Sequence, residues 1–238
     1  MTKSRTTKFN RFDDFATMLA ALTDKIVHRL SEAIASRGHA TLVVSGGNTP
    51  GDLFDMLSRQ ALPWHRVSIT LSDERWVSVA SEASNERLVR SRLLTYEARP
   101  ARFVSLKTEQ ETARDAEHEV NVLISQMPRP FDVVLLGIGI DGHTASLIPK
   151  SSGLIQALDL SNPALVRHII PPEATKMGER MTLTLRGILD SRLVILMMRG
   201  EAKLAAYERA AGASDLSEAP VRGIINQDRT PFTAYWGP

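Results

Sequence analysis

The chain has 238 residues, of which 43% are hydrophobic, so it is long and apolar enough to bury a sizeable core. Its 29 basic and 27 acidic residues leave a net charge of +2, which gives no indication of binding to nucleic acid or to a membrane surface. Cysteine is absent, which excludes disulfides, thiolate metal ligands and cysteine nucleophiles, and is consistent with a reducing, cytoplasmic location.

The first part of the chain predicts one long helix and no membrane segment. Basic residues near the start are not followed by an apolar stretch, and the longest apolar run, 133–140, is too short to span a bilayer. From Phe12 to Ile34 apolar residues recur every three or four positions, the spacing of one face of an amphipathic helix. Gly38 is placed to end that helix. We therefore expect a soluble cytoplasmic protein.

Short apolar runs alternate with helical patterns along the rest of the chain. We predict strands over 40–44, 67–71, 103–106, 131–136 and 193–198, and helices over 50–57, 85–94, 111–124 and 201–211. Strands that are apolar throughout are typical of a parallel sheet with helices on both faces. The pattern predicts a doubly wound, mostly parallel α/β sheet. No internal repeat or obvious linker interrupts it, so we expect one domain over residues 1–238.

The loop after the first of these strands has the composition of an anion site. It reads Ser45-Gly46-Gly47-Asn48-Thr49-Pro50. Paired glycines let backbone N–H groups approach an anion, hydroxyls donate, and the start of the following helix favours negative charge. We predict a phosphate cradle, and the competing interpretation is a tight turn that needs glycine for its geometry. The lysine and the spacing of the P-loop are missing.

The loop after the second strand places two carboxylates and an arginine at a strand end. Asp73, Glu74 and Arg75 lie there, and Ser84 and Asn85 precede the next predicted helix. Arginine suits the recognition of an oxyanion or a phosphate, and the carboxylates could orient it or bind sugar hydroxyls. The alternative interpretation is a charged surface cluster, with Ser84 or Asn85 capping the helix.

The loop at 135–149 holds the strongest candidate for catalysis. Its three glycines resemble a dinucleotide fingerprint, but Pro149 interrupts the helix that such a fingerprint requires, and we reject that interpretation. His143 follows Asp141 by two residues in a loop shaped by glycine. The carboxylate can orient the imidazole and leave one ring nitrogen free as a base. The alternative is a structural histidine.

Two basic residues further along are candidate phosphate ligands. Arg180 begins a segment with Thr182 and Thr184 that reads as a strand, and Lys203 lies at the start of the last predicted helix. A cation near a helix N-terminus is unfavourable unless an anion joins it. Taken alone, each residue is more often solvated surface, and it is their combination with the glycine-rich loop that favours phosphate binding. No metal site is predicted, because the chain has neither an H-E-x-x-H motif nor a cysteine pair.

Six segments carry a family resemblance: SGGNTP at 45–50, SDERWV at 72–77, SNERL at 84–88, FDVVLLGIGIDGHTASLIP at 131–149, ERMTLT at 179–184 and GEAK at 200–203. Together and in this order they resemble the 6-phosphogluconolactonase family, which is grouped with the glucosamine-6-phosphate deaminases. The resemblance runs nearly from end to end, and the 131–149 string is its most specific part. Asn48 stands where serine is commoner, and the tail ends YWGP without the aspartate often seen there.

The resemblance implies a three-layer α/β/α sandwich with a modified Rossmann-like, mostly parallel sheet. It implies hydrolysis of 6-phosphoglucono-1,5-lactone to 6-phosphogluconate in the oxidative pentose phosphate pathway. No cofactor is implied, and the sugar-phosphate lactone is the expected small-molecule partner. A monomer and a weak homodimer both stay open.

The resemblance also assigns roles by position. His143 corresponds to the histidine that activates water, Asp141 to its acidic neighbour, and Arg75 to the arginine of the DER motif. Arg180 and Lys203 correspond to the cations that hold the phosphate together with the glycine-rich turn. The predicted substrate-binding residues are Ser45, Gly46, Gly47, Asn48, Thr49, Asp73, Asn85, Arg180 and Lys203. A lactone is already a reactive ester and no G-x-S-x-G elbow is present, so we expect direct attack by water.

Two other functions stay open from the sequence. One is a sugar-phosphate isomerase or deaminase of the same superfamily. The deaminases follow the DGH stretch with a phenylalanine, an asparagine and a glutamate, where Ser146, Leu147 and Ile148 stand here. Isoleucine cannot handle the protons of a leaving amine, which argues against deamination. A non-catalytic sugar-phosphate-binding protein would keep the cradle but would not need Asp141 and His143.

Overall fold

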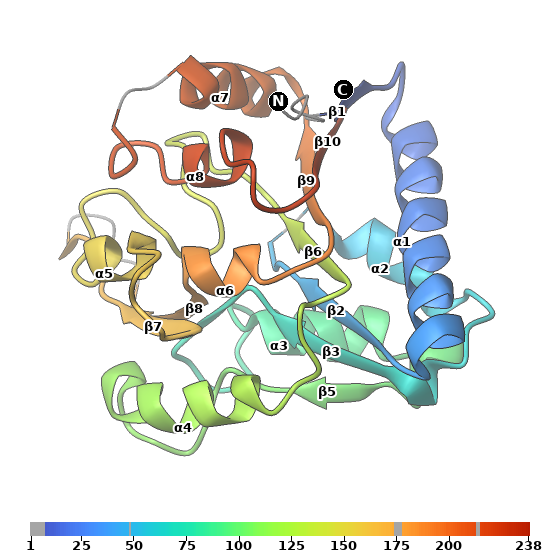
Figure 1. The fold of residues 1–238 in the computed structure, drawn as a ribbon, viewed down its shortest axis with the longest axis horizontal. Helices are drawn as coiled ribbons and strands as arrows, with labels where there is room; N and C mark the ends of the chain where they lie inside the picture. Colours follow the sequence, from blue (N-terminus) through green and yellow to red (C-terminus); the bar gives the residue numbers. More distant parts are fainter. Residues whose placement is uncertain (1–7, 48, 174–177, 213–214) are drawn as a thin grey trace.

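The computed structural model describes residues 8–47, 49–173, 178–212 and 215–238 (Figure 1). A sheet of seven parallel strands forms its centre. In spatial order the strands are β1 (Lys8–Arg11), β10 (Phe232–Gly237), β9 (Val194–Arg199), β6 (Val133–Leu136), β2 (Ala40–Val44), β3 (Val67–Leu71) and β5 (Arg102–Val104). The fully apolar runs in the middle of this sheet are buried along their whole length, as expected for strands covered on both faces.

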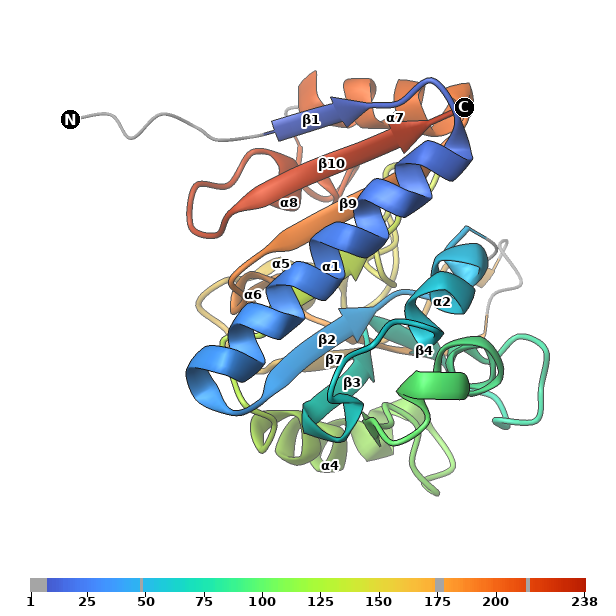
Figure 2. The same cartoon turned by 90° about the vertical axis from the view of Figure 1, so that its right-hand side faces the viewer.

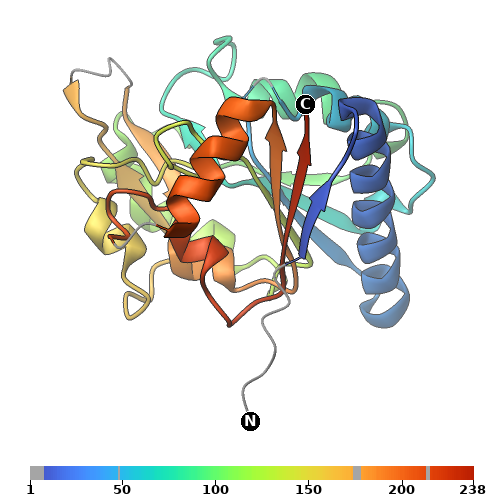
Figure 3. The same cartoon turned by 90° about the horizontal axis from the view of Figure 1, so that it is seen from above.

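Helices cover both faces of the sheet. Figure 2 shows α1 (Phe15–Arg37) lying over one face of the sheet, and α2 (Gly51–Ser58) packs beside α1. Figure 3 shows α7 (Glu201–Gly212) on the opposite face. The predicted three-layer α/β/α arrangement is therefore confirmed. The other helices are α3 (Asn85–Leu88), α4 (Ala113–Ser125), α5 (Leu154–Leu158), α6 (Leu185–Leu189), α8 (Arg222–Ile225), the π-helix η2 (Val89–Leu93) and the short 3-10 turns η1 (Trp64–Arg66) and η3 (Tyr96–Ala98).

A second, smaller sheet stands beside the first. Its strands are antiparallel, in the order β4 (Asp73–Arg75), β8 (Arg180–Leu183) and β7 (Val166–Ile169). β4 follows β3 after a single residue, and the N–H of Ser72 at this junction donates to the carbonyl of Val44. The short sheet thus continues outward from the carboxyl ends of the main strands, where ligands bind in folds of this kind.

Most of the predicted elements are confirmed. The strands predicted over 40–44 and 67–71 match β2 and β3 at both ends, and the other three match with ends shifted by one or two residues. The helix predicted over 85–94 changes its winding, because α3 continues into the π-helix η2. The sequence pattern does not predict β1 and β10. β1 has a single apolar residue, Phe9, and is held to the sheet by backbone pairing with one neighbour.

Local signals set the ends of α1. Asp14 accepts a hydrogen bond from the N–H of Thr17 at 2.7 Å and caps the start of the helix. Gly38 adopts a φ of 80° and donates its N–H to the carbonyl of Ile34, which confirms the predicted end. None of the helices in the described part of the chain combines the length and apolar character needed to cross a bilayer.

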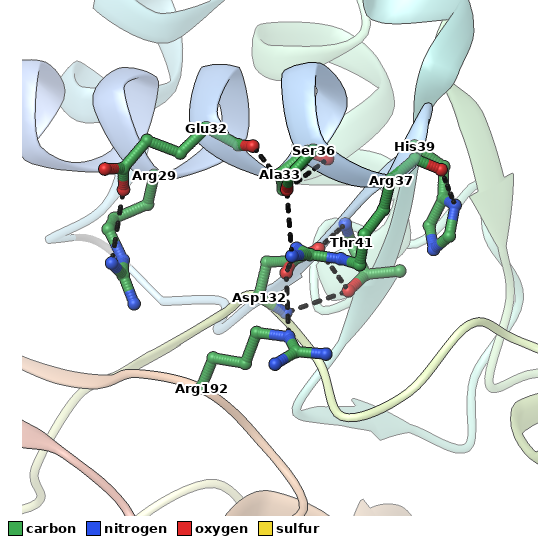
Figure 4. A network of polar contacts seen from close by, with 9 residues as sticks. All are labelled: Arg29, Glu32, Ala33, Ser36, Arg37, His39, Thr41, Asp132 and Arg192. Atoms are coloured by element: carbon green, nitrogen blue, oxygen red, sulfur yellow. Dashed lines mark hydrogen bonds and ion pairs between the residues drawn. The ribbon is translucent and has the colours of Figure 1, made fainter.

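A buried carboxylate fastens the amino ends of the central strands, at the edge of the sheet away from the predicted site loops (Figure 4). Asp132 is 4% exposed and accepts hydrogen bonds from the N–H and the hydroxyl of Thr41 at 2.9 and 3.2 Å. Arg37 at the end of α1 pairs with the same carboxylate, and the Nε of Arg192 lies 3.4 Å from it. This one side chain therefore joins α1, β2, β6 and the segment that leads into β9.

We expect Asp132→Ala to lower the free energy of unfolding by about 2–3 kcal/mol, because the substitution leaves a buried N–H, a buried hydroxyl and partly buried arginines without their acceptor. Urea unfolding followed by circular dichroism measures the change. Glu32→Ala is the matched control, because its ion pairs with His28 and Arg29 are exposed; it should change stability by less than about 0.5 kcal/mol. Equal losses in both variants would contradict this account.

Candidate active site

A cavity of about 190 Å³ opens at the carboxyl ends of the central strands. Its wall brings together most of the predicted site residues: Ser45, Gly46, Gly47, Thr49, Asp73, Arg75, Asn85, His143, Arg180 and Lys203. Asn48 lies outside the described residues. Segments far apart in the sequence meet here because β2, β6 and β9 are neighbours in the sheet and all point the same way.

The structure places Asp141 against the imidazole of His143. The Nδ1 atom of His143 lies 2.6 Å from the Oδ1 atom of Asp141, and the backbone N–H of His143 donates to the same oxygen at 3.2 Å. The hydrogen bond with His143 lowers the pKa of Asp141 to about 2, so the carboxylate is ionised at neutral pH. An ionised carboxylate can only accept, so Nδ1 carries a proton, and in the neutral form of the ring Nε2 is the nitrogen that can accept one.

The glycines of this loop leave the space that the Asp141–His143 pair occupies. A Cβ atom at Gly139 would lie 2.1 Å from Nδ1 of His143 and 2.4 Å from Oδ1 of Asp141, which no side chain tolerates. Gly142 adopts a φ of 82°, in the region that favours glycine, and its N–H closes the turn onto the carbonyl of Gly139. The glycine spacing thus serves the pairing of a carboxylate with an imidazole, which accords with rejecting a dinucleotide fingerprint.

The two carboxylates of the second loop have different surroundings. Asp73 lines the cavity, accepts from the hydroxyl of Ser146 at 2.6 Å, and lies 3.8 Å from Nη1 of Arg180. Glu74 is 1% exposed and accepts from the N–H groups of Arg75, Asn85 and Glu86. Burial raises the pKa of Glu74 against the effect of these hydrogen bonds. Glu74 therefore anchors the start of α3.

Asn85 packs directly over the glycine-rich loop. A Cβ atom at Gly46 would lie 1.9 Å from Oδ1 of Asn85, and the Nδ2 atom of Asn85 donates to the carbonyl of Asp73 at 2.8 Å. The cap of α3 is Ser84, whose hydroxyl accepts from the N–H of Arg87. α2 follows the glycine-rich loop, and its N-cap residue Pro50 makes no side-chain capping hydrogen bond. The loop and this helix start together keep backbone donors near the cavity.

Two arginines of the cavity stand directly opposite each other. Arg75 of β4 and Arg180 of β8 are partners in the antiparallel register. The Nε atom of each is buried and has no hydrogen-bond partner among the described residues, although Nη1 of Arg75 donates to the carbonyl of Ala83. Burial lowers the pKa of Arg180. Like charges directly across a strand pair are unfavourable, so an anion between them would relieve both repulsion and desolvation.

A third cation reaches the cavity from the opposite side. Lys203 lies in the first turn of α7, and its ammonium group donates to the carbonyl of Ile138 in the loop that carries His143. Burial lowers the pKa of Lys203, and the charge of Asp141 opposes this effect. The arrangement leaves a desolvated positive charge beside the proposed base, which an anionic ligand would stabilise.

Several residues of the site escape sequence reasoning. Ser146, which holds Asp73, lies 73 positions from it, and Arg209 of α7 donates to the carbonyl of Ile140 at 2.8 Å. Arg199 at the end of β9 also lines the cavity. In the sequence, the one signal for Arg199 as a site residue is its position at a strand end, just before Gly200. In the described part of the chain no three histidine, aspartate or glutamate side chains are grouped so as to hold a metal ion.

Comparison with known proteins identifies the family. Residues 13–236 match the family described as glucosamine-6-phosphate isomerases/6-phosphogluconolactonase. A 6-phosphogluconolactonase of Rhizobium meliloti is 40% identical over 228 residues, covering 95% of this chain and 97% of the relative. The chain belongs to this family. The resemblance predicted from the six sequence segments is thereby confirmed.

Two further relatives of the glucosamine-6-phosphate isomerase/6-phosphogluconolactonase family agree. A 6-phosphogluconolactonase of Mesorhizobium japonicum is 39% identical over 231 residues, covering 97% of this chain and 95% of the relative. The crystal structure of a 6-phosphogluconolactonase from Shewanella baltica has a TM-score of 0.94 at 42% identity, and the match covers 98% of each chain. The similarity thus extends over the whole fold and is not confined to the site loops.

We expect Gly139→Ala to separate Asp141 from His143 and to change the tautomer of the imidazole. The added methyl group would overlap both side chains, so the ring would lose the carboxylate that keeps the proton on Nδ1. Long-range ¹H–¹⁵N NMR of the histidine ring should show mainly the Nδ1–H form in the wild type and mainly Nε2–H in the variant. Gly137→Ala, where a Cβ meets nothing within 4 Å, is the control. An unchanged tautomer in Gly139→Ala would refute the proposed crowding.

Proposed function

We propose that this chain hydrolyses 6-phospho-D-glucono-1,5-lactone to 6-phospho-D-gluconate, as a cytoplasmic one-domain enzyme without a cofactor. The observation that carries the proposal is the 2.6 Å contact between Asp141 and His143 at the wall of a cavity lined by cations. Relatives named 6-phosphogluconolactonase, at 39–40% identity over nearly the whole chain, support the choice of substrate.

His143 acts as the general base in this proposal. Its Nε2 atom takes a proton from water as the water oxygen forms a bond to the lactone carbonyl carbon. The resulting tetrahedral intermediate breaks its bond to the ring oxygen, which leaves with the proton from His143, and the open chain ends in a carboxylic acid that then ionises. Asp141 holds the imidazole in the required tautomer. General base catalysis of this kind contributes a factor of about 10²–10⁴ in rate.

The phosphate group has a complete set of donors in this cavity. The glycine-rich loop with Ser45 and Thr49 offers backbone and hydroxyl donors, and the start of α2 lies next to it. Arg180 and Lys203 supply partly buried positive charge. We assign the phosphate to this group of residues, including Asn48, and the sugar hydroxyls to Asp73 and Asn85.

Arg75 is proposed to stabilise the oxyanion that develops on the carbonyl oxygen. The loop, Arg180 and Lys203 already match the charge of a phosphate dianion. Arg75 differs from Arg180 because one of its terminal nitrogens is held by the carbonyl of Ala83, which fixes the guanidinium before substrate binds. Such preorganised donors act on charge that appears only in the transition state.

The alternative functions fit the site less well. Ser146, Leu147 and Ile148 are all buried, and none brings a carboxylate to the place where a deaminase would need one. A non-catalytic sugar-phosphate-binding protein would have no use for an imidazole oriented by a carboxylate. The Asp141–His143 pair therefore favours catalysis over simple binding.

Substitution of the proposed base and substitution of a phosphate-binding residue should change different kinetic constants. His143→Ala should lower kcat by about 10²–10⁴ with little change in KM, since it removes proton transfer. Lys203→Ala should raise KM by about 10- to 100-fold with kcat nearly unchanged, the worth of a charge-assisted hydrogen bond. The assay generates the lactone in situ and subtracts spontaneous hydrolysis in buffer. A reversed pattern would refute this division of roles, and an inactive, folded wild type would refute the lactonase itself.

The role of Arg75 has its own test. Arg75→Gln should lower kcat by about 10²–10³, the usual effect of removing one oxyanion donor, while KM changes little. The same lactone assay measures both constants, and circular dichroism checks the fold. A raised KM at normal kcat would assign Arg75 to the phosphate instead.

A further inference from the structure

One continuous segment grips the glycine-rich loop at both of its ends. Residues 85–93, which form α3 and η2, bring Asn85 over Gly46 at the start of the loop and Arg92 over Gly51 just beyond its end. A Cβ atom at Gly51 would lie 2.0 Å from Nη1 of Arg92. The end of the guanidinium therefore lies against the first residue of α2, where the proposed phosphate site ends.

Arg92 uses this position to bind two carboxylates of α2. Its Nε atom donates to Oδ1 of Asp55 at 2.9 Å, and its Nη2 atom donates to Oδ1 of Asp52 at 3.0 Å and to the other oxygen of Asp55. The side chain of Arg92 is 34% exposed, and the hydrogen bond with Arg92 lowers the pKa of Asp55. One guanidinium thus forms ion pairs with both Asp52 and Asp55.

The charge of these acids conflicts with the proposed ligand. Asp52 lies in the first turn of α2 and Asp55 one turn further. Acidic residues near a helix N-terminus stabilise the helix, but here they lie next to the loop that would receive a phosphate dianion. Repulsion between these charges and the dianion would weaken binding. Arg92 offsets the acidic charge next to the loop, where that charge would weaken phosphate binding most.

We propose that Arg92 is a positioning residue for phosphate recognition, which offsets the charge of Asp52 and Asp55 beside the glycine-rich loop. The inference rests on the proposed function for its substrate. Arg92 does not line the cavity and touches no reacting group. Its effect should therefore fall on the binding of phosphorylated ligands and leave the chemical step unchanged.

The decisive variant is Arg92→Gln. We expect its KM for the phosphorylated lactone to rise about tenfold with kcat within about twofold, and inhibition by inorganic phosphate to weaken by the same factor. Hydrolysis of unphosphorylated glucono-1,5-lactone should not change. Arg90→Gln is the matched control, because Arg90 lies on the same π-helix but pairs with Glu86. Equal KM values for the two variants would overturn the inference.

Neutralising the acids tests the charge argument directly. Arg92→Gln combined with Asp52→Asn and Asp55→Asn should recover most of the lost affinity, and failure to recover it would overturn the inference. Asp52→Asn alone should lower KM about two- to threefold; its side chain is 59% exposed, so this variant decides the matter even if Arg92→Gln does not fold. A raised or unchanged KM there would count against the inference. Loss of lactonase activity in the wild type would refute the proposed function alone, and phosphate titration by calorimetry would still test Arg92.

Discussion

Close packing of polar side chains onto glycine governs the whole carboxyl edge of the sheet. Asn85 lies against Gly46, Arg92 against Gly51, and the Asp141–His143 pair against Gly139; in each case a Cβ atom would fall within 2.1 Å of a side-chain atom. The glycines therefore do more than permit unusual backbone angles. They let side chains from distant parts of the chain approach the backbone of the site loops, and this approach fixes where the functional groups stand.

The parallel sheet determines which loops share this edge. β9, β6 and β2 are consecutive neighbours, so the helix start with Lys203, the loop with His143 and the glycine-rich loop lie side by side. The small antiparallel sheet then adds Arg75 and Arg180 from β4 and β8. Burying these cations without an anion is unfavourable. The cavity therefore favours an anionic ligand. In the proposed function, binding energy from a remote phosphate would hold the reactive end of the substrate against His143.

Much of this could be predicted from the sequence, because apolar strands and the loops after them are local signals. Asp141 and His143 are only two positions apart in the sequence, so their spacing alone was enough to predict that they pair. The bond from Ser146 to Asp73 and the contact of Arg92 with Gly51 were not, since each joins segments tens of residues apart. Glu74 shows the same limit: its charge suggested a ligand contact, whereas burial under three backbone donors makes it an anchor.

The fold leaves the choice of reaction to a few positions, because the family includes both isomerases and lactonases. Asp73 could serve as a base in such a cavity, but here its carboxylate already accepts from the hydroxyl of Ser146 and lies 3.8 Å from Nη1 of Arg180. Ile148 fills a buried position without offering a proton. Among the described residues His143 is the one histidine that lines the cavity, and its Nδ1 atom has a carboxylate partner in Asp141. An ester that needs only activated water matches this arrangement, whereas removing an amine would demand a second proton-handling group.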